Sequence, residues 1–242
     1  MKRVLLILCM GTVGCAGVPR APVPPPKGSI GGYSATDCVE IVHVRPTPPD
    51  VAARLLPDGY RLALGPDGQA QVIFALYGCP AFAIDGRPAP GGVVAEHAVR
   101  IDAPDGSPGR HAYLLHLVTS VLPLAAALAP LSDGIELARD ASLEVGHGSP
   151  GEKTVVRGRI RGDRFEAGWV GDPVVEPRDG PVDPDAKGVT FWLQTDAGRV
   201  QLDYSSRMRP RSTGTVTVVS GGVETSGQGA YLRFDPTVRV VR

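Results

Sequence analysis

The segment Ala70-Gln71-Val72-Ile73-Phe74-Ala75-Leu76-Tyr77 is nearly continuously apolar, and it indicates the fold class. A run of this length that is rich in β-branched and aromatic residues is typical of a β-strand buried on both faces. Turn signals bound the run, with Asp67-Gly68 before it and Asp85-Gly86 after it. We therefore predict a fully buried strand here.

Strand patterns continue over most of the chain. They occupy residues 39–44, 93–101, 111–118, 153–161, 165–170, 189–194, 199–204, 213–219 and 231–241. Asp163 and the group Asp196-Ala197-Gly198 each lie between two such segments, and these steps favour hairpins because glycine accepts positive φ. Helical patterns occupy residues 49–56 and 121–131. The sequence predicts a mainly β (α+β) fold, an antiparallel closed or partly closed β-barrel with two short outer helices.

The N-terminus has the pattern of an export signal. Lys2-Arg3 is basic, residues 4–10 are apolar, and small residues precede Cys15. This arrangement resembles a bacterial lipoprotein signal, in which the cysteine is lipidated and becomes the new N-terminus, although Thr12 stands where that pattern prefers leucine. The alternative is an ordinary signal peptide cleaved near Ala16 or Gly17, which gives a secreted or periplasmic soluble protein.

The chain therefore divides into three parts. We predict a signal peptide over residues 1–14, a lipidated Cys15 with a Pro-rich tether over residues 15–36, and a single β-rich domain over residues 37–242. The expected location is extracytoplasmic, with a membrane as the partner of the lipid anchor at Cys15. The sequence leaves open whether this is an inner or an outer membrane.

Charge and cysteine content narrow the function classes. Lys+Arg and Asp+Glu both number 25, so no basic excess predicts a nucleic-acid partner. Cys38 and Cys79 are an even pair in an exported domain, which predicts a disulfide; two buried free thiols are the alternative. Two cysteines lack the four ligands of a structural zinc site, and we predict no metal and no cofactor. GxSxG, HExxH, Walker and dinucleotide-binding motifs are all absent, which argues against the common hydrolases and nucleotide enzymes.

One charged residue interrupts a strand pattern. Glu96 follows Val93-Val94-Ala95, and in a barrel interior such a carboxylate needs a partner and has a raised pKa. The alternative is a side chain that faces solvent. His111 and His116 are five residues apart, which places them on opposite faces of a regular strand, so this pair alone predicts no metal site.

The order of these features resembles acetoacetate decarboxylase-like proteins. Residues 53–60 end in Leu56-Pro57-Asp58-Gly59-Tyr60, similar to a helix end of that family, and residues 94–99 are similar to its strand with an active-site glutamate. Residues 113–118 and a helix that leads to Gly134 follow in the same order, so the resemblance covers residues 39–145. It implies a cone-shaped antiparallel β-barrel, helices packed outside and a central apolar pocket that contains Glu96.

The chain departs from the family at its catalytic lysines. Family decarboxylases use a lysine Schiff base, activated by a second lysine in a desolvated site. The resemblance places those lysines after the helix, but residues 134–143 contain none, and an arginine such as Arg139 forms no imine because it stays protonated. Lys153 comes too late and fits a strand residue that faces water. Decarboxylation through a Schiff base is therefore not expected.

These observations favour an exported, lipid-anchored β-barrel that binds a small, partly apolar ligand without covalent chemistry. The candidate ligand-binding residues are Glu96, His116 and Arg139, and no residue is predicted to be catalytic. Glu96 suits a ligand that carries an amine, whereas Arg139 suits a ligand that carries an acid. Two alternatives remain open: an enzyme of the same fold with Glu96 as acid and base, and a structural or protein-binding envelope lipoprotein.

Overall fold

The structure is a computed structural model that describes residues 30–146, 151–174, 188–196, 198–208 and 212–241. Its strands are β1 (Gly32–Thr36), β2 (Cys38–Thr47), β3 (Ala70–Ile84), β4 (Arg87–Ile101), β5 (Arg110–Thr119), β6 (Ile135–Leu137), β7 (Asp140–Val145), β8 (Val156–Arg161), β9 (Glu166–Gly171), β10 (Val189–Thr195), β11 (Gly198–Met208), β12 (Ser212–Ser220) and β13 (Val223–Val241). The helices are α1 (Pro49–Ala53), α2 (Leu122–Leu128) and the 3-10 turn η1 (Ala129–Leu131).

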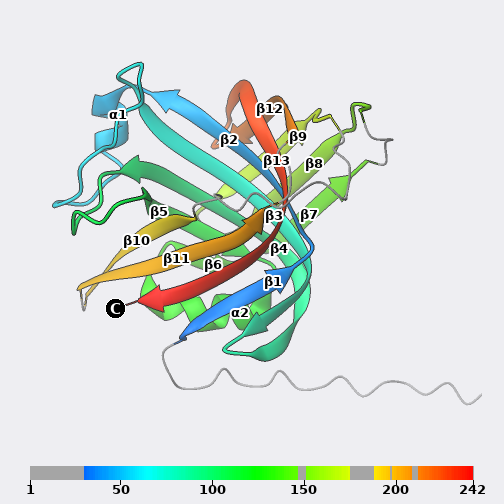
Figure 1. Ribbon diagram of the computed structural model, residues 1–242, viewed down its shortest axis with the longest axis horizontal. Coiled ribbons are helices and arrows are strands. Elements are labelled where there is room, and N and C mark those ends of the chain that lie inside the picture. The colour runs from blue at the N-terminus through cyan, green and yellow to red at the C-terminus, as the bar shows by residue number, and fades with distance from the viewer. Residues whose placement is uncertain (1–29, 147–150, 175–187, 197, 209–211, 242) are drawn as a thin grey trace, which may run out of the picture.

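Seven strand positions close into a ring (Figure 1). The order around it is β3, β4, β5, β10, β11 and β13, and the seventh position is shared by β1 and β2, which follow each other between β13 and β3. Neighbours in the ring are antiparallel except β5 and β10, which are parallel. The predicted mainly β fold with a closed ring and two short helices is confirmed.

The sheet forks at β13. Residues Val223–Tyr231 pair with β12, whereas residues Phe234–Val241 pair with β11. The strands β12, β9, β8 and β7 leave the ring in that order and form an outer sheet that lies against β3, β4 and β5. Gly158 in β8 permits this approach, because a Cβ there lies 2.0 Å from Cδ2 of Leu76.

The fork gives the molecule two apolar cores, one on each face of β3 and β4. Tyr77, Val94 and Ala98 belong to the core inside the ring, whereas Leu76 and Ala95 belong to the core between the ring and the outer sheet. The prediction that residues 70–77 form a strand buried on both faces is therefore correct. It holds because adjacent residues of a strand point to opposite faces and both faces here are covered.

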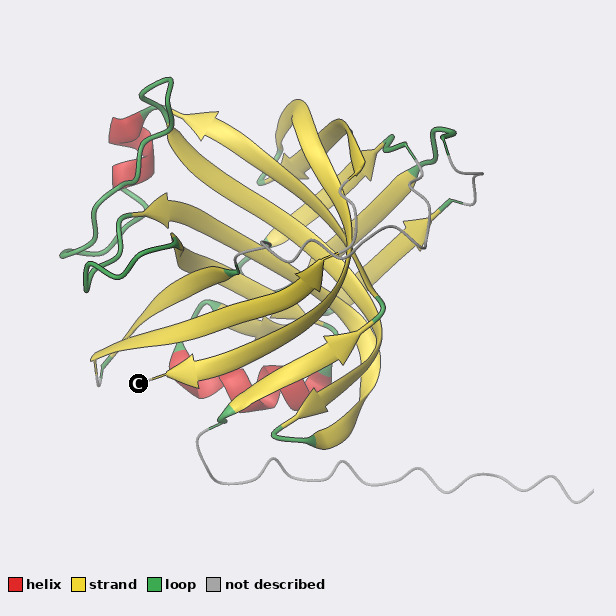
Figure 2. Ribbon diagram, viewed as in Figure 1, coloured by secondary structure: helices red, strands yellow, loops and turns green. Residues whose placement is uncertain are grey.

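The helices lie outside the strands, with α1 at the ends of β2 and β3 (Figure 2). Pro49 and Pro123 lie in the first turns of α1 and α2, where a missing N–H costs nothing. α1 is shorter than the predicted 49–56, and α2 continues into η1 as predicted for 121–131. α2 packs Leu124 and Leu128 against the ring core. None of the helices in the described part of the chain is long and apolar enough to cross a membrane.

The predicted tether over residues 15–36 is wrong at its C-terminal end. Gly32–Thr36 is β1, which pairs with β3 and β13, and Ile30, Tyr33 and Ala35 are buried. The folded domain therefore begins before residue 37. Residues 1–29 lie outside the described residues, so the signal peptide and lipidated Cys15 stay predictions. Most of the predicted loop at 172–188 also lies outside them.

Candidate functional site

Glu96 lies in the middle of β4 with its side chain inside the ring. Only 3% of the residue is exposed. Val94 and Ala98, two positions away on either side, belong to the inner core, and Ala95 faces the outer core. Of the two readings that the sequence left open, the structure therefore supports a buried carboxylate rather than one that faces solvent.

Three tyrosines from separate strands surround this carboxylate. Tyr77 of β3 donates to Oε1 of Glu96 at 3.4 Å, and the Tyr204 hydroxyl of β11 donates to the same oxygen. Tyr33 of β1 contacts both hydroxyls, with 3.1 Å between its hydroxyl and that of Tyr77. We call Glu96, Tyr33, Tyr77 and Tyr204 the inner polar cluster.

Aromatic rings form the walls around the inner polar cluster. Phe234 packs edge-on against Tyr77 with ring centroids 5.5 Å apart, and Phe191 packs in the same way against Tyr204 at 5.2 Å. Both phenylalanines are buried in the inner core. The carboxylate is thus held by hydroxyl groups within an apolar surround.

This environment changes the acidity of every member of the cluster. Burial raises the pKa of the Glu96 carboxyl from 4.5 to about 7, and the hydrogen bonds from Tyr204 and Tyr77 oppose that rise. Burial also raises the pKa of Tyr33, Tyr77 and Tyr204, with further increases from the negative charge of Glu96. The tyrosines therefore remain protonated donors, while Glu96 titrates near neutral pH.

Glu96 has no cationic partner among the described residues. The ion pairs between described residues all involve other carboxylates and lie at the surface. No positive charge contributes to the pKa of Glu96 either. The ionised carboxylate is therefore stabilised by hydroxyl groups alone, whereas buried charges are ordinarily paired.

The structure does not bring the three predicted ligand-binding residues together. His116 lies on the opposite face of the ring wall from Glu96, where its ring stacks 5.6 Å from that of His97. Arg139 lies at the surface with 66% of its side chain exposed and pairs with Asp163. Strand alternation and the fork at β13 place these three residues in three different environments, so no one site contains all of them.

The segment in which the resemblance expects lysines forms β6 and the start of β7. It contains no lysine in the sequence. Lys153, the next lysine in the chain, has 69% of its side chain exposed and pairs with Asp172 at 2.8 Å. The structure thus places this amine at the surface, as the sequence predicted.

Sequence reasoning missed the three tyrosines of the cluster. Tyr77 ended the apolar run that indicated the fold, but nothing local distinguished it from a core residue. Tyr33 lay in the predicted tether, and Tyr204 is 171 residues from Tyr33. One signal could have found Tyr77. Val94 is two residues from Glu96 and so points to the same face of β4, and Tyr77 of β3 pairs with Val94.

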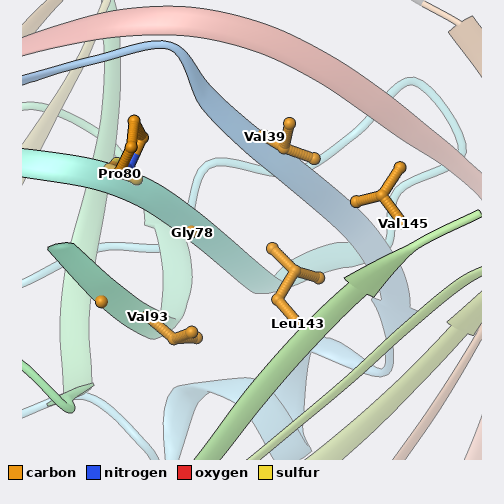
Figure 3. A pocket seen from close by; sticks show the side chains of 8 residues that line it. Val39, Gly78, Pro80, Val93, Leu143 and Val145 are labelled. Carbon is orange, nitrogen blue, oxygen red and sulfur yellow. The ribbon is translucent and has the colours of Figure 1, made fainter.

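The predicted disulfide between Cys38 and Cys79 is present in the structure. It joins β2 to β3 beside a groove of about 350 Å³ on the outer side of the ring wall. Figure 3 shows Leu143 and Val145 of β7 on one side of this groove, beside Val39 and Val93. The groove has no ionisable lining residue, so it provides no group for acid–base chemistry.

The comparisons with known proteins agree with this architecture. No protein-family model matches the sequence, and no curated protein gives a significant match. Nine solved chains match in structure. Acetoacetate decarboxylase from Legionella pneumophila subsp. pneumophila str. Philadelphia 1 has a TM-score of 0.60 and 13% identity, over 92% of this chain and 93% of that one.

Two further structures give similar values. One from structural studies of acetoacetate decarboxylase has a TM-score of 0.58 and 10% identity, over 87% of this chain and 88% of that chain. The enduracididine biosynthesis enzyme MppR, solved with the condensation product of pyruvate and imidazole 4-carboxaldehyde, has a TM-score of 0.56 and 14% identity, over 91% and 90%. At these identities the likeness shows the fold, which is the acetoacetate decarboxylase-like fold that the sequence resemblance indicated.

Proposed function

We propose that this chain, which has the acetoacetate decarboxylase-like fold, is an exported and lipid-anchored protein that binds a small, partly apolar molecule with a basic nitrogen. Glu96 holds the nitrogen inside the ring, and no Schiff base forms. The observation that carries the proposal is the inner polar cluster: a buried carboxylate that accepts two tyrosine hydroxyls and has no cationic partner among the described residues.

The chemistry of the cluster favours an amine over other ligands. A ligand ammonium supplies the opposite charge that the buried carboxylate lacks, and it lowers the pKa of Glu96 by favouring the ionised form. The apolar part of the ligand packs against rings such as Phe191 and Phe234. An acid-bearing ligand has less support, because Arg139 is at the surface and already paired.

Among the described residues, no lysine supports a Schiff-base decarboxylase. Residues 134–143 contain none, and Lys153 is exposed and paired with Asp172. Arginine cannot replace lysine in imine formation, because its guanidinium stays protonated. Export has two supports: the signal pattern before Cys15 and the Cys38–Cys79 disulfide, since disulfides persist in oxidising compartments.

Calorimetric titration with benzylamine tests the ligand proposal, with benzyl alcohol as the uncharged probe of similar shape. We expect benzylamine to bind the wild-type protein and Glu96→Gln to weaken it at least about tenfold, the effect of a lost charge-assisted hydrogen bond. Glu166→Gln is the matched control, because that glutamate is exposed on β9. Equal binding of benzylamine to wild-type protein and Glu96→Gln contradicts the proposal, and so does the absence of binding.

Carboxyl-carbon NMR of Glu96 gives an independent test of the same site. The pKa of about 7 should fall when benzylamine is added, and benzyl alcohol should leave it unchanged. A Glu96 signal that titrates identically in the presence of both probes places the amine elsewhere and refutes this mode of binding.

A second candidate function is acid–base catalysis by Glu96, favoured by its pKa near neutrality. A carboxyl group of this acidity removes and returns protons next to a carbonyl group. Exchange of the α-hydrogens of 2-butanone in deuterated water, followed by proton NMR, tests it. Catalysed exchange that Glu96→Gln abolishes and Glu166→Gln retains supports an enzyme. If the wild-type protein and both variants leave the exchange at its uncatalysed rate, this reaction is excluded.

Mass spectrometry of the mature protein from a bacterial host tests the anchor. A diacyl or triacyl N-terminal Cys15 is expected, and Cys15→Ser should abolish the mass increase and release the protein from the membrane fraction. An N-terminus at Ala16 or further along without added lipid supports simple secretion instead.

If neither amine binding nor proton exchange is found, a structural or protein-binding lipoprotein becomes the better account of the function.

A further inference from the structure

The outer face of the ring wall carries a row of aromatic side chains that runs across four strands. His43 of β2 lies opposite Phe74 of β3, Phe74 lies opposite His97 of β4, and His97 lies opposite His116 of β5. The rings of Phe74 and His97 stack at 4.5 Å, and those of His97 and His116 stack at 5.6 Å. We call these four residues the histidine row.

One side chain next to the outer sheet stacks directly on this row. Phe165, between β8 and β9, is buried and stacks on both His97 and His116 with centroid distances of 5.3 Å. Its turn is fixed by Glu136 of β6, whose carboxylate accepts the backbone N–H groups of Asp163, Arg164 and Phe165. Phe165 is therefore held over the histidines from a defined position.

His97 and His116 are half-buried, and burial disfavours the charged form of each ring. None of the described residues hydrogen-bonds to either ring nitrogen of His97 or to Nδ1 of His116, and these atoms are buried. A charged imidazole needs acceptors for both of its N–H groups. Protonation therefore leaves both buried N–H groups of His97 without an acceptor, at a contact that is otherwise aromatic.

Charged groups around the row act on its histidines in both directions. Arg45 of β2 lies over the Phe74 ring at 5.3 Å and disfavours positive charge on His97 and His43. At His116, burial lowers the pKa most, Glu136 of β6 opposes this, and Arg164 of the β8–β9 turn lowers the pKa further. The histidines also repel one another once charged, since the charge of His116 lowers the pKa of His97.

We propose that the histidine row is an acid-sensitive latch: protonation of His97 and His116 releases the Phe165 turn and the outer sheet from the ring, while the ring itself stays folded. The pairings among β3, β4, β5, β10 and β11 and the Cys38–Cys79 disulfide involve no strand of the outer sheet, whose strand pairing to the ring runs through β13. This inference does not depend on the identity or presence of a ligand at Glu96.

The expected effect of pH on opening follows from the pKa of His97. Burial, together with the charges of His116 and Arg45, lowers this pKa from 6.5 to about 3. In an open state the pKa returns to about 6.5, so proton uptake favours opening about thirtyfold at pH 5. The effect begins below pH 6.5 and grows as the pH falls further.

The chain has two tryptophans, one in each layer, and they serve as reporters. Trp169 of β9 is buried in the core between ring and outer sheet, whereas Trp192 of β10 belongs to the ring and donates to His111. In a Trp192→Phe protein, the emission of Trp169 should shift to longer wavelength between pH 7.5 and pH 5. Amide hydrogen exchange of the wild-type protein is the second measurement, and residues 156–171 should lose protection while residues 70–77 keep it.

The variant His97→Phe/His116→Phe keeps the aromatic stack and removes both titrating groups, so its emission and exchange should not respond to pH in this range. His111→Gln is the matched control outside the row. Its emission in the Trp192→Phe background and its amide exchange should respond to pH as they do without this substitution. Three results overturn the latch: no change of either readout at pH 5, the same change in the double phenylalanine variant, or loss of protection in ring and outer sheet together. If the double variant does not fold, His97→Phe alone gives the same comparison with a smaller shift.

Discussion

Replacement of Glu96 by glutamine should make the protein's stability less sensitive to alkaline pH. The carboxyl of Glu96 has a pKa of about 7 in the folded protein and 4.5 as its reference value. Because the folded state holds the proton more tightly, stability from this group is fully present below pH 4.5 and is lost as the pH rises through 7. Glutamine keeps an oxygen that Tyr77 and Tyr204 can donate to, but it never ionises.

The magnitude follows from the two pKa values. Their difference corresponds to about 3 kcal/mol of unfolding free energy in full, of which about 2.5 kcal/mol falls between pH 5 and pH 8. Wild-type protein should therefore lose about 2.5 kcal/mol relative to Glu96→Gln over this range. The comparison between variants removes contributions from groups that both proteins share, including the histidines.

Urea denaturation followed by circular dichroism at pH 5 and pH 8 measures the unfolding free energy of each protein. The change between the two pH values is then compared between wild type and Glu96→Gln. Glu166→Gln is the control, since its exposed carboxylate gives no reason for a deviation from wild type. A wild-type protein and a Glu96→Gln variant that change in parallel, within about 0.5 kcal/mol, refute the assignment of a high pKa to the inner polar cluster.

Three further predictions concern single contacts. Tyr204→Phe removes a hydrogen bond that favours the ionised carboxylate, so carboxyl-carbon NMR should show a higher pKa for Glu96 than in wild type. Reduction of the Cys38–Cys79 disulfide should lower the unfolding free energy by about 4 kcal/mol, and the reductant should not affect Cys38→Ala/Cys79→Ala. Gly158→Ala should destabilise the protein by about 1–3 kcal/mol, because its Cβ lies 2.0 Å from Leu76. Gly168→Ala, whose nearest contact is 3.8 Å away, should be close to neutral in the same thermal-unfolding assay.

The sequence predicted those features that depend on neighbouring residues. The apolar run at residues 70–77 indicated a strand covered on both faces, and β3 has a core on each side. Glu96 stood out because it interrupts an apolar strand, and it proved to be buried. Cys38 and Cys79 were an even pair, and they lie opposite each other across β2 and β3.

Features that depend on distant pairing were not predictable in this way. β1 is short and weakly apolar, and it is a strand because β3 and β13 provide partners on both of its edges. β7 pairs with β8 on the outer sheet, which the local pattern of residues 134–143 did not indicate. The histidine row depends on the registers of β2 to β5, so His97 and His116 become neighbours only after these strands pair.

Strand alternation predicts that acid acts in opposite directions on the two layers. Glu96 and His97 are adjacent in β4, and they point into different cores. A fall from pH 8 to pH 5 should protonate Glu96 and stabilise the ring by about 2.5 kcal/mol. The same fall costs the closed outer sheet about 2 kcal/mol at pH 5, because the folded pKa of His97 lies below its open-state value and its stability contribution is lost below pH 6.5. Acid should therefore stabilise the ring around Glu96 and destabilise the packing of the outer sheet on His97. Glu96 and His97 lie on opposite faces of the same strand, β4.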